Sequence, residues 1–503
     1  MKFGVDYRHI ASPMISAESP YAGYIFESST AVATNSAQLA IVIQQKSATP
    51  VFHEVAIFAQ DQWRVNSRLS LSSGVRWEID PPPTEEHGDL PYTLLGSLGD
   101  PSKLQLAPQG TPLWHSSWFN FAPRFGAAWT VHDLPSFLTV VRAGGGVFFD
   151  SDNQLAVRGF SGVGFQAGKY IFNASVPIPP SELAFAPSAT APYTSDAVYA
   201  FPSHLQLPYT LEWNVSLEQA LGSMQALTVA YVGSSGRRLT GTQEYSLSSQ
   251  NPDFGTVFYF PNGITSNYQA LQAKFQRSVA HGIQTLASYT WSHSLDFGSN
   301  GSELPLTRGN SDFDVRSNFQ FGAAWDIPSN QTRLGKLLLS DWSADARILA
   351  RTGFPVTLGG NQVVDPGTGS IYTGGVDLVP NVPLYIHGAL YPGGRIINKA
   401  AFTLPTGTNI GTAPRNFVRG FGMAQMNFAM RRNIHLTDQV SLLLRGEAFN
   451  ILNHPNFGLI DSTLTDATFG EATMMLNGSL ATISSQYQQG GSRSLQLALK
   501  LQF

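Results

Sequence analysis

The chain of 503 residues is poor in charge: 13% of its residues are charged, 43% are hydrophobic and 12% are aromatic, with a formal net charge of -4. An average soluble protein carries roughly a quarter charged residues. The aromatic content excludes a disordered tract, and the absence of cysteine excludes disulfide scaffolds, thiolate zinc sites and cysteine nucleophiles. The sequence contains no cluster of lysine and arginine residues, so nothing in it indicates nucleic acid as a partner. We expect a large folded protein rich in β-structure.

The amino terminus does not have the features of a signal peptide. Residues Met1 to Arg8 contain no apolar core segment, and no run of about 18 apolar residues occurs anywhere in the chain. Transmembrane helices are therefore not expected. If the chain meets a membrane, it must do so through strands.

Apolar and polar residues alternate with a period of two in about fourteen segments, the pattern of strands with one apolar face. In chain order these segments are 2–10, 51–63, 69–78, 118–131, 137–149, 209–218, 225–233, 268–277, 283–292, 316–327, 341–351, 424–436, 440–450 and 493–503. Most contain about 10 residues or more, the length that a tilted strand needs to cross a hydrocarbon core. Strands of soluble proteins cluster near five or six residues.

The links between these segments alternate in length. Short links such as 64–68 and 437–439 are separated by long ones near 79–117, 150–208 and 352–423. Outer-membrane barrels place short turns on the periplasmic side and long loops outside. We therefore predict an all-β fold, an antiparallel transmembrane β-barrel with long extracellular loops and a carboxyl terminus on the periplasmic side.

The two faces of the predicted strands differ in chemistry. Charged residues on the polar faces are candidates to line a hydrated lumen: Arg76, Glu78, Arg124, Arg142, Glu212, Glu218, Lys274, Arg347, Arg445 and Glu447. Tryptophans near strand ends are candidates for the aromatic girdles at the membrane interfaces: Trp63, Trp77, Trp129, Trp291 and Trp325. The alternative is a soluble β-sandwich or propeller with tryptophans in its core and charges in bulk water.

Several stretches resemble TonB-dependent outer-membrane receptors. They are Phe58-Ala59-Gln60-Asp61-Gln62-Trp63-Arg64-Val65 followed by Leu69 to Glu78, then Phe121-Ala122-Pro123-Arg124-Phe125-Gly126, and Arg142 to Asp150. Ser311 to Arg316, Gly353-Phe354-Pro355-Val356 and Arg445 to Gly458 resemble the Oar-like subgroup. The resemblance spans nearly the whole chain, and it implies uptake or binding of a bulky solute such as a glycan, siderophore or peptide.

Some features that are typical of this family are not found in this sequence. Members of the family typically carry a plug domain, a TonB box and 22 strands, whereas about fourteen strands and no plug are found here. We expect residues 1–503 to be the carboxyl-terminal barrel portion of a longer receptor. A TonB-type coupling protein would then act only if a plug is supplied elsewhere. Leu499, Leu501 and terminal Phe503 resemble the carboxyl-terminal signal that the barrel assembly machinery recognises.

Four motifs in the sequence are candidates for chemical sites, and each has a simpler structural interpretation. Gly144-Gly145-Gly146 lacks the helix of a phosphate-binding loop and favours a strand bend or close backbone approach. Gly233-Ser234-Ser235-Gly236 lacks the nucleophile-elbow spacing and is interpreted as a loop leaving a strand. His53-Glu54 lacks the second histidine of a zinc site, because position 57 is Ile57. Asp312 and Asp314 have a spacing that calcium could use, but capping with Arg316 is favoured.

These observations predict an outer-membrane protein without catalytic residues, metal or other cofactor, in contact with outer-membrane lipid and located in a Gram-negative bacterium. Transport is the favoured function. The alternative is a structural or adhesive outer-membrane protein acting through its surface loops, and a soluble β-propeller hydrolase is a third possibility. The long loops contain many Tyr, Phe, Asn, Ser, Gly and Pro residues but no sharp motif, so no ligand-binding residue is named.

Overall fold

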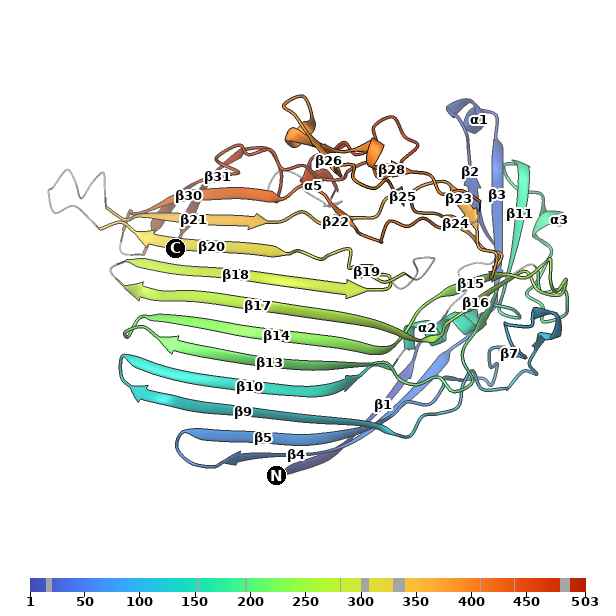
Figure 1. Cartoon of the computed structure of the whole chain (residues 1–503), viewed down its shortest axis with the longest axis horizontal. Coiled ribbons are helices and arrows are strands. Elements are labelled where there is room, and N and C mark those ends of the chain that lie inside the picture. The colour runs from blue at the N-terminus through green and yellow to red at the C-terminus, as the bar shows by residue number, and fades with distance from the viewer. Residues whose placement is uncertain are drawn as a thin grey trace.

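One antiparallel sheet dominates the computed structural model. The structure describes residues 1–503 except 15–19, 152, 195–196, 281, 300–306, 329–339, 408, 438 and 480–488. Fourteen long strands lie side by side, each next to the strand that precedes or follows it along this path (Figure 1). We call this sheet the wall. None of the helices in the described ranges is long and apolar enough to cross a membrane.

Each of the predicted segments coincides with a wall strand, so the all-β antiparallel prediction is confirmed. The wall strands are β1 (Lys2–Ala11), β4 (Pro50–Arg64), β5 (Leu69–Ile79), β9 (Asn120–Leu134), β10 (Phe137–Phe149), β13 (Tyr209–Ala220), β14 (Gln225–Thr240), β17 (Asn262–Ala280), β18 (Ile283–Asp296), β20 (Ser317–Asp326), β21 (Trp342–Arg351), β30 (Met423–His435), β31 (Ser441–Phe449) and β32 (Ser494–Gln502). Short turns join them at one end and long loops leave the other (Figure 1).

Glycines account for one wrong prediction and one correct one. Gly233 to Gly236 does not leave a strand but lies inside β14, paired with β13 and β17. The small residue is needed because a Cβ at Gly233 would come within 2.4 Å of the Trp213 ring. The triple glycine lies inside β10, where a Cβ at Gly146 would meet Arg124 at 2.9 Å, so the predicted close approach is confirmed.

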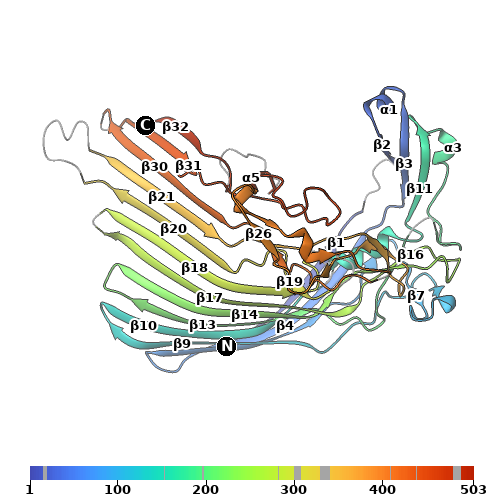
Figure 2. The same ribbon diagram turned by 45° about the horizontal axis from the view of Figure 1, so that its top comes forward.

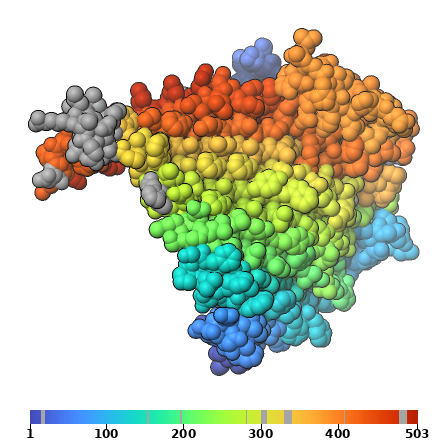
Figure 3. All heavy atoms as spheres, turned by 60° about the vertical axis from the view of Figure 1, so that its left-hand side comes forward, coloured from blue at the N-terminus to red at the C-terminus, as the bar shows by residue number. Residues whose placement is uncertain are grey.

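The register of the wall separates an apolar face from a polar face, because neighbouring residues of a strand point to opposite sides. One rung of paired residues is apolar throughout: Leu69, Trp129, Val141, Leu217, Val229, Ala273, Tyr289, Phe319 and Ala350. The adjacent rung is largely polar: Ser70, Ala128, Arg142, Ser216, Ala230, Gln272, Thr290, Asn318 and Arg351. The space-filling view shows the wall strands following one another in chain order as successive colour bands (Figure 3).

The wall ends in two edge strands. Among the described residues β1 pairs only with β4, and β32 pairs only with β31. The strand order therefore runs from β1 to β32 without a pairing that joins the two edges. Figures 1 and 2 show β32 far from β1 across the sheet.

The long loops carry structure that the strand pattern did not predict. β2 (Tyr21–Ile25), β3 (Ser36–Gln45) and β11 (Gln166–Ser175) form a three-stranded sheet that projects from the loop end of the wall together with α1 (Ser29–Ala33) and α3 (Pro180–Leu183) (Figure 2). We call it the arm. Ala40 and Val42 of β3 are fully buried on one face of the arm, whereas Tyr170 and Phe172 of β11 are exposed.

Short paired strands build the rest of the loop end. They are β6 (Thr84–Glu85), β7 (Leu94–Leu95), β8 (Gln105–Leu106), β12 (Val198–Ala200), β15 (Gln243–Ser246), β16 (Thr256–Tyr259), β19 (Gly309–Asn310), β22 (Pro355–Val356), β23 (Gln362–Val364), β24 (Ile371–Thr373), β25 (Asp377–Leu378), β26 (Tyr385–His387), β27 (Arg395–Ile397), β28 (Phe402–Thr403) and β29 (Val418–Arg419). Helical turns α2 (Asn153–Ala156) and α5 (Leu476–Ser479) accompany them. The largest loop core surrounds Val376, Ile397, Val418 and Ile460. The long loops are therefore folded units with apolar cores of their own.

Candidate functional site at the loop end of the wall

The ten predicted lumen residues share the polar face of the wall. In every strand from β5 to β31 that carries one of them, the residue occupies the alternate positions whose side chains point to the same side as the polar rung described above. Six of the ten form three ion pairs within the set: Arg142 Nε lies 3.0 Å from Glu218 Oε1, Arg76 Nε lies 2.7 Å from Glu78 Oε1 and Arg445 Nη2 lies 2.5 Å from Glu447 Oε1. The arrangement places mixed charges along one surface. Their role in lining a lumen stays a prediction.

The predicted girdle tryptophans lie on the opposite, apolar face. Trp63, Trp129, Trp291 and Trp325 are each exposed, and the Trp77 ring stacks on Phe121 with centroids 5.8 Å apart. Leu499 and Leu501 of β32 point to the same face, where they pair in register with Leu444 and Leu442. Phe503 follows the strand and is exposed. The girdle and assembly-signal roles of these residues stay predictions.

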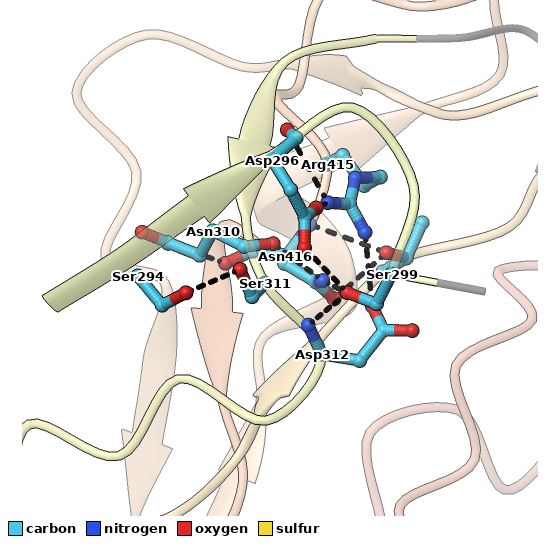
Figure 4. Close-up of polar contacts among 9 residues, drawn as sticks. Ser294, Asp296, Ser299, Asn310, Ser311, Asp312, Arg415 and Asn416 are labelled. Atoms are coloured by element: carbon cyan, nitrogen blue, oxygen red, sulfur yellow. Dashed lines mark hydrogen bonds and ion pairs between the residues drawn. The ribbon is translucent and has the colours of Figure 1, made fainter. Parts of the chain in front are cut away.

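A buried cluster of polar side chains connects the loop between β28 and β29 to the end of β18 (Figure 4). Arg415 lies in the loop before β29, and its side chain is only 5% exposed. Its guanidinium pairs with Asp296 at the end of β18, and Nη1 donates to Asp312 Oδ1 at 2.9 Å. Asn416 donates to the same carboxylate at 2.6 Å and to the Asn310 carbonyl at 2.7 Å. We call this set the Arg415 joint.

A second arginine extends the joint toward the wall. The Asp314 side chain is 1% exposed and pairs with Arg419 of β29, which also donates to the Asp314 carbonyl at 2.7 Å. The Ser294 backbone N–H donates to Asp314 Oδ1 at 2.7 Å, and His293 Nδ1 lies 3.4 Å from that oxygen. A buried charge pair of this kind is strongly coupled to its surroundings, because removing one partner leaves the other charge unpaired.

The joint corrects the prediction made for Asp312 and Asp314. Their partners are Arg415 and Arg419, which are 103 and 105 residues further along the chain, and no pairing with Arg316 is found in the part of the chain that the structure describes. Guanidinium groups thus occupy the positions that a cation would need. Within the described ranges no cluster of three or more histidine, aspartate or glutamate side chains could hold a metal ion.

An apolar groove lies next to the joint. Its volume is about 430 Å³, and its lining combines aromatic and aliphatic side chains with a polar edge: Phe354, Val356, Phe421, Phe457, Leu459, Ile460, Leu476, Asp312, Thr357, Asn416 and Ser462. The Phe421 and Phe457 rings lie 5.1 Å apart, and the Arg395 guanidinium lies 5.1 Å from the Phe421 centroid. A concave apolar surface with a few polar groups at one edge is typical of a site for an organic ligand.

Part of the last long loop packs against the polar face of the wall. Leu476 of α5 is buried with Leu349 of β21 and Met423 of β30. The Gly490 backbone N–H donates to Gln425 Oε1 at 2.7 Å. The groove is therefore bounded on one side by a residue that also touches the wall, which links the loop cores to the strands.

An acidic group lies at the other side of the wall, near β1. Arg76 Nη2 lies 3.2 Å from Asp6 Oδ2, while Arg8 lies 3.5 Å from both Asp6 and Glu54. Asp80 follows β5 directly and is 9% exposed. Burial, together with the charges of Glu54 and Glu78, raises the pKa of Asp80 to about 7. Arg76 and Glu78 were predicted from the sequence as polar-face residues, whereas Asp6, Glu54 and Asp80 were not.

The residues of the Arg415 joint and of the groove were also missed as site residues. For the joint, the sequence signal was the Asp312-x-Asp314 pair, which was assigned a local partner. For the groove, Phe354, Val356 and Phe457 lie in stretches that resemble the Oar-like subgroup, but no binding role was assigned to them. Asp296 ends β18, Arg415 lies in a loop and Arg419 lies in β29, and nothing in their spacing along the sequence identifies them as a set. The site forms because residues far apart in the sequence pair with one another when the loops fold.

The match of the chain to one protein-family model agrees with the architecture. Residues 1–496 match the family model described as outer membrane beta barrel domain. No curated protein sequence shows significant similarity to the chain. Among solved structures, the FrpB iron transporter from Neisseria meningitidis matches with a TM-score of 0.46 at 10% identity, covering 99% of this chain and 51% of that one.

Two further solved structures show similar values. The copper transporter OprC matches with a TM-score of 0.41 at 12% identity over 92% of this chain and 54% of that one. The ferric-catecholate import receptor Fiu from K12 E. coli has a TM-score of 0.41 at 10% identity, covering 92% and 50%. The chain spans about half the length of these structures.

Proposed function

Since this chain belongs to the outer membrane beta barrel domain family and is located in the outer membrane of a Gram-negative bacterium, we propose that it binds or takes up a bulky solute as a TonB-dependent receptor of the Oar-like type. The observation that carries this proposal is the groove of about 430 Å³ at the loop end, where Phe354, Phe421 and Phe457 face a polar edge. The proposal includes no catalytic step.

The surroundings of the groove support ligand binding in two ways. The Arg415 joint fixes the loop that carries Asn416 and Gly420, so the groove is held in shape before a ligand arrives. The polar face of the wall lies beside it, since the guanidinium of Arg351 in β21 stacks on the groove residue Phe354, 3.9 Å from the ring centroid. A solute with an aromatic or aliphatic part and hydrogen-bonding groups would fit this combination, because a preformed site loses little conformational entropy on binding.

Energy coupling is a separate part of the proposal. Residues 1–503 would act as the barrel portion of a longer receptor, and a TonB-type protein would couple to it only through a plug supplied elsewhere. Reading the nucleotide sequence upstream of Met1 for codons of a plug and a TonB box tests this part. An energy-dependent uptake by the chain alone would contradict it.

Binding can be tested on the purified chain in detergent. A panel of ferric siderophores, oligosaccharides and peptides is screened for ligands that raise the unfolding temperature, which follows from preferential binding to the folded state. Phe421→Ala and Phe457→Ala should abolish the shift that a ligand produces. Phe172→Ser on the arm is the matched control and should leave the shift unchanged. Equal shifts in all variants would contradict the groove as the site.

The adhesive alternative is favoured by one observation, the exposed apolar face of the arm. In register, Tyr170 lies beside Ile41 and Phe172 lies beside Leu39, which in turn pairs with Ile25 of β2; Tyr170 and Phe172 are 65% and 72% exposed. Large exposed apolar patches often mark interaction surfaces. Cells that carry Tyr170→Ser with Phe172→Ser should lose attachment to a surface or to other cells if adhesion is the function, and solute binding should persist.

A further inference from the structure

A small cavity with an excess of acid lies at the loop end of β1, β4 and β5. Its volume is about 260 Å³, and residues Phe149 to Ser151 after β10 form its other side. Five carboxylates line it, those of Asp6, Glu54, Glu78, Asp80 and Asp150, against the two guanidinium groups of Arg8 and Arg76. The cavity is thus negative when its carboxylates are ionised.

Both guanidinium groups are already engaged. Arg76 pairs with Glu78 at 2.7 Å and with Asp6 at 3.2 Å. Arg8 lies 3.5 Å from Asp6 and 3.5 Å from Glu54. The two arginines therefore pair with Asp6, Glu54 and Glu78, and their charges offset only part of the cost of burying the Asp80 carboxylate.

Asp80 is the carboxylate that this arrangement leaves without a partner. It is 9% exposed, and no hydrogen bond or ion pair reaches it from the residues that the structure describes. The register of β4 with β5 pairs Val55 with Ile79, so one further step places Asp80 opposite Glu54. Like charges directly opposite one another are destabilising. Asp150, by comparison, accepts a hydrogen bond from the Ser151 backbone N–H at 2.8 Å.

A buried carboxylate in this position needs either a proton or a cation. Burial without a partner disfavours the charged form, and the nearby Glu54 and Glu78 add to the effect. Together these effects raise the pKa of Asp80 to about 7. A positively charged group entering the cavity would offset these effects.

We propose that this cavity binds the ammonium group of a small organic cation, with Asp80 as the anionic partner and Glu54 and Asp150 at its sides. A metal ion fits less well, because the described carboxylates form no cluster of metal-binding geometry. An alkylammonium group needs only one close carboxylate and space for its chain, which about 260 Å³ supplies. The inference does not depend on transport, since it requires only that water reach the polar face.

The test uses the full chain folded in detergent and spermidine as the probe. Binding is measured by titration calorimetry at pH 8 for the parent chain, for Asp80→Asn and for the control Asp345→Asn. Asp345 also lies on the polar face but has a partner, Arg431, at 3.8 Å. We expect Asp80→Asn to weaken binding at least about tenfold, the effect of losing a charged partner, and Asp345→Asn to leave it unchanged.

A second readout follows from protonation. Affinity of the parent chain should fall between pH 8 and pH 6 as Asp80 gains a proton, whereas the residual affinity of Asp80→Asn should not change in this way. A heat-dependent gel shift confirms that each variant is folded. A blocked trilysine peptide in parallel titrations distinguishes a free amine from a lysine side chain as the source of the ammonium group. Absence of spermidine binding at pH 8, or equal binding by parent and Asp80→Asn, would overturn the proposal.

Discussion

The Asp80 cavity and the Arg415 joint contain the same residue types but reach opposite states. At the joint, Arg415 and Arg419 arrive from a distant loop and neutralise Asp296, Asp312 and Asp314 in a closely packed contact. At the cavity, both arginines come from the wall strands and pair within them. The charges of the joint are paired with one another and hold a loop in place, whereas the cavity is open and contains the unpaired Asp80 carboxylate.

The comparison shows that charge composition alone does not define a site on the polar face. Whether the carboxylates become structural or stay open to a ligand depends on whether a distant loop places an arginine against them. Where it does, the polar groups become structural, because a satisfied buried network rigidifies its surroundings. Where it does not, the same groups are available to a ligand. Four substitutions test this difference.

The largest effect is expected from Arg415→Met. It leaves Asp296 and Asp312 without their cation in a buried setting, and breaking such a pair costs on the order of 3–5 kcal/mol. Urea unfolding of the folded chain would show this loss, and limited proteolysis should cleave the loop before β29 faster. Adding Asp296→Asn and Asp312→Asn should recover part of the loss. Stability equal to that of the parent chain would mean that the joint does not hold the loop.

Glu85→Gln should have the next largest effect. Glu85 is 8% exposed; burial raises its pKa, but backbone N–H groups of Thr49, Asp89 and His87 outweigh this and lower it. A carboxyl with a lowered pKa stabilises the fold above its ordinary range and loses this contribution as pH falls. We expect a loss of about 1–3 kcal/mol at pH 7, shrinking below about pH 4. A pH-independent difference would contradict this origin.

Asp80→Asn should act in the opposite direction and more weakly. Because the pKa of Asp80 is raised to about 7, its stabilising protonated form is lost as pH rises from about 4 through 7. The variant should therefore be more stable than the parent chain by about 1–2 kcal/mol at pH 8, with little difference near pH 4. Unfolding curves at both pH values measure it. A destabilised variant at pH 8 would indicate a bonding role for the carboxylate.

The smallest effect is expected from Arg142→Met. Arg142 and Glu218 form an ion pair of 3.0 Å across β10 and β13, but their side chains are 52% and 41% exposed. Exposed pairs contribute about 0–1 kcal/mol and are screened by salt. The unfolding midpoint should thus change little and should converge with that of the parent chain at high salt. A loss of stability as large as that caused by Arg415→Met would show that the Arg142–Glu218 pair is less accessible to water than its exposed fractions indicate.

The wall could be predicted from sequence because its determinants are local. Alternation along Leu495, Leu497, Leu499 and Leu501 requires only the two-residue period of a strand, and antiparallel neighbours follow from short turns. β3 was missed although Leu39, Ile41 and Ile43 alternate with Ala40 and Val42. Both of its sets of side chains are apolar, so the two-sided contrast that identifies a wall strand is absent there.

The candidate sites could not be predicted because their contacts are non-local. Arg415 and Asp312 are 103 residues apart, and their meeting depends on how the loop before β29 folds over the end of β18. Asp80 and Glu54 are brought together by strand register, which was not assigned from sequence. Arg76 and Glu78 were identified because they sit on a predicted polar face, and this face was the only part of the site with a periodic signal.

The contact of Leu476 and Gly490 with the polar side of β21 and β30 has a consequence for permeation. Strand number fixes the maximum diameter of a pore, but an inward-folded loop reduces the open cross-section at its own height. If the polar face lines a pore, as proposed, the loop would narrow that pore at Leu349 and Gln425. Trimming that loop would then enlarge the aperture while leaving every wall strand in its place.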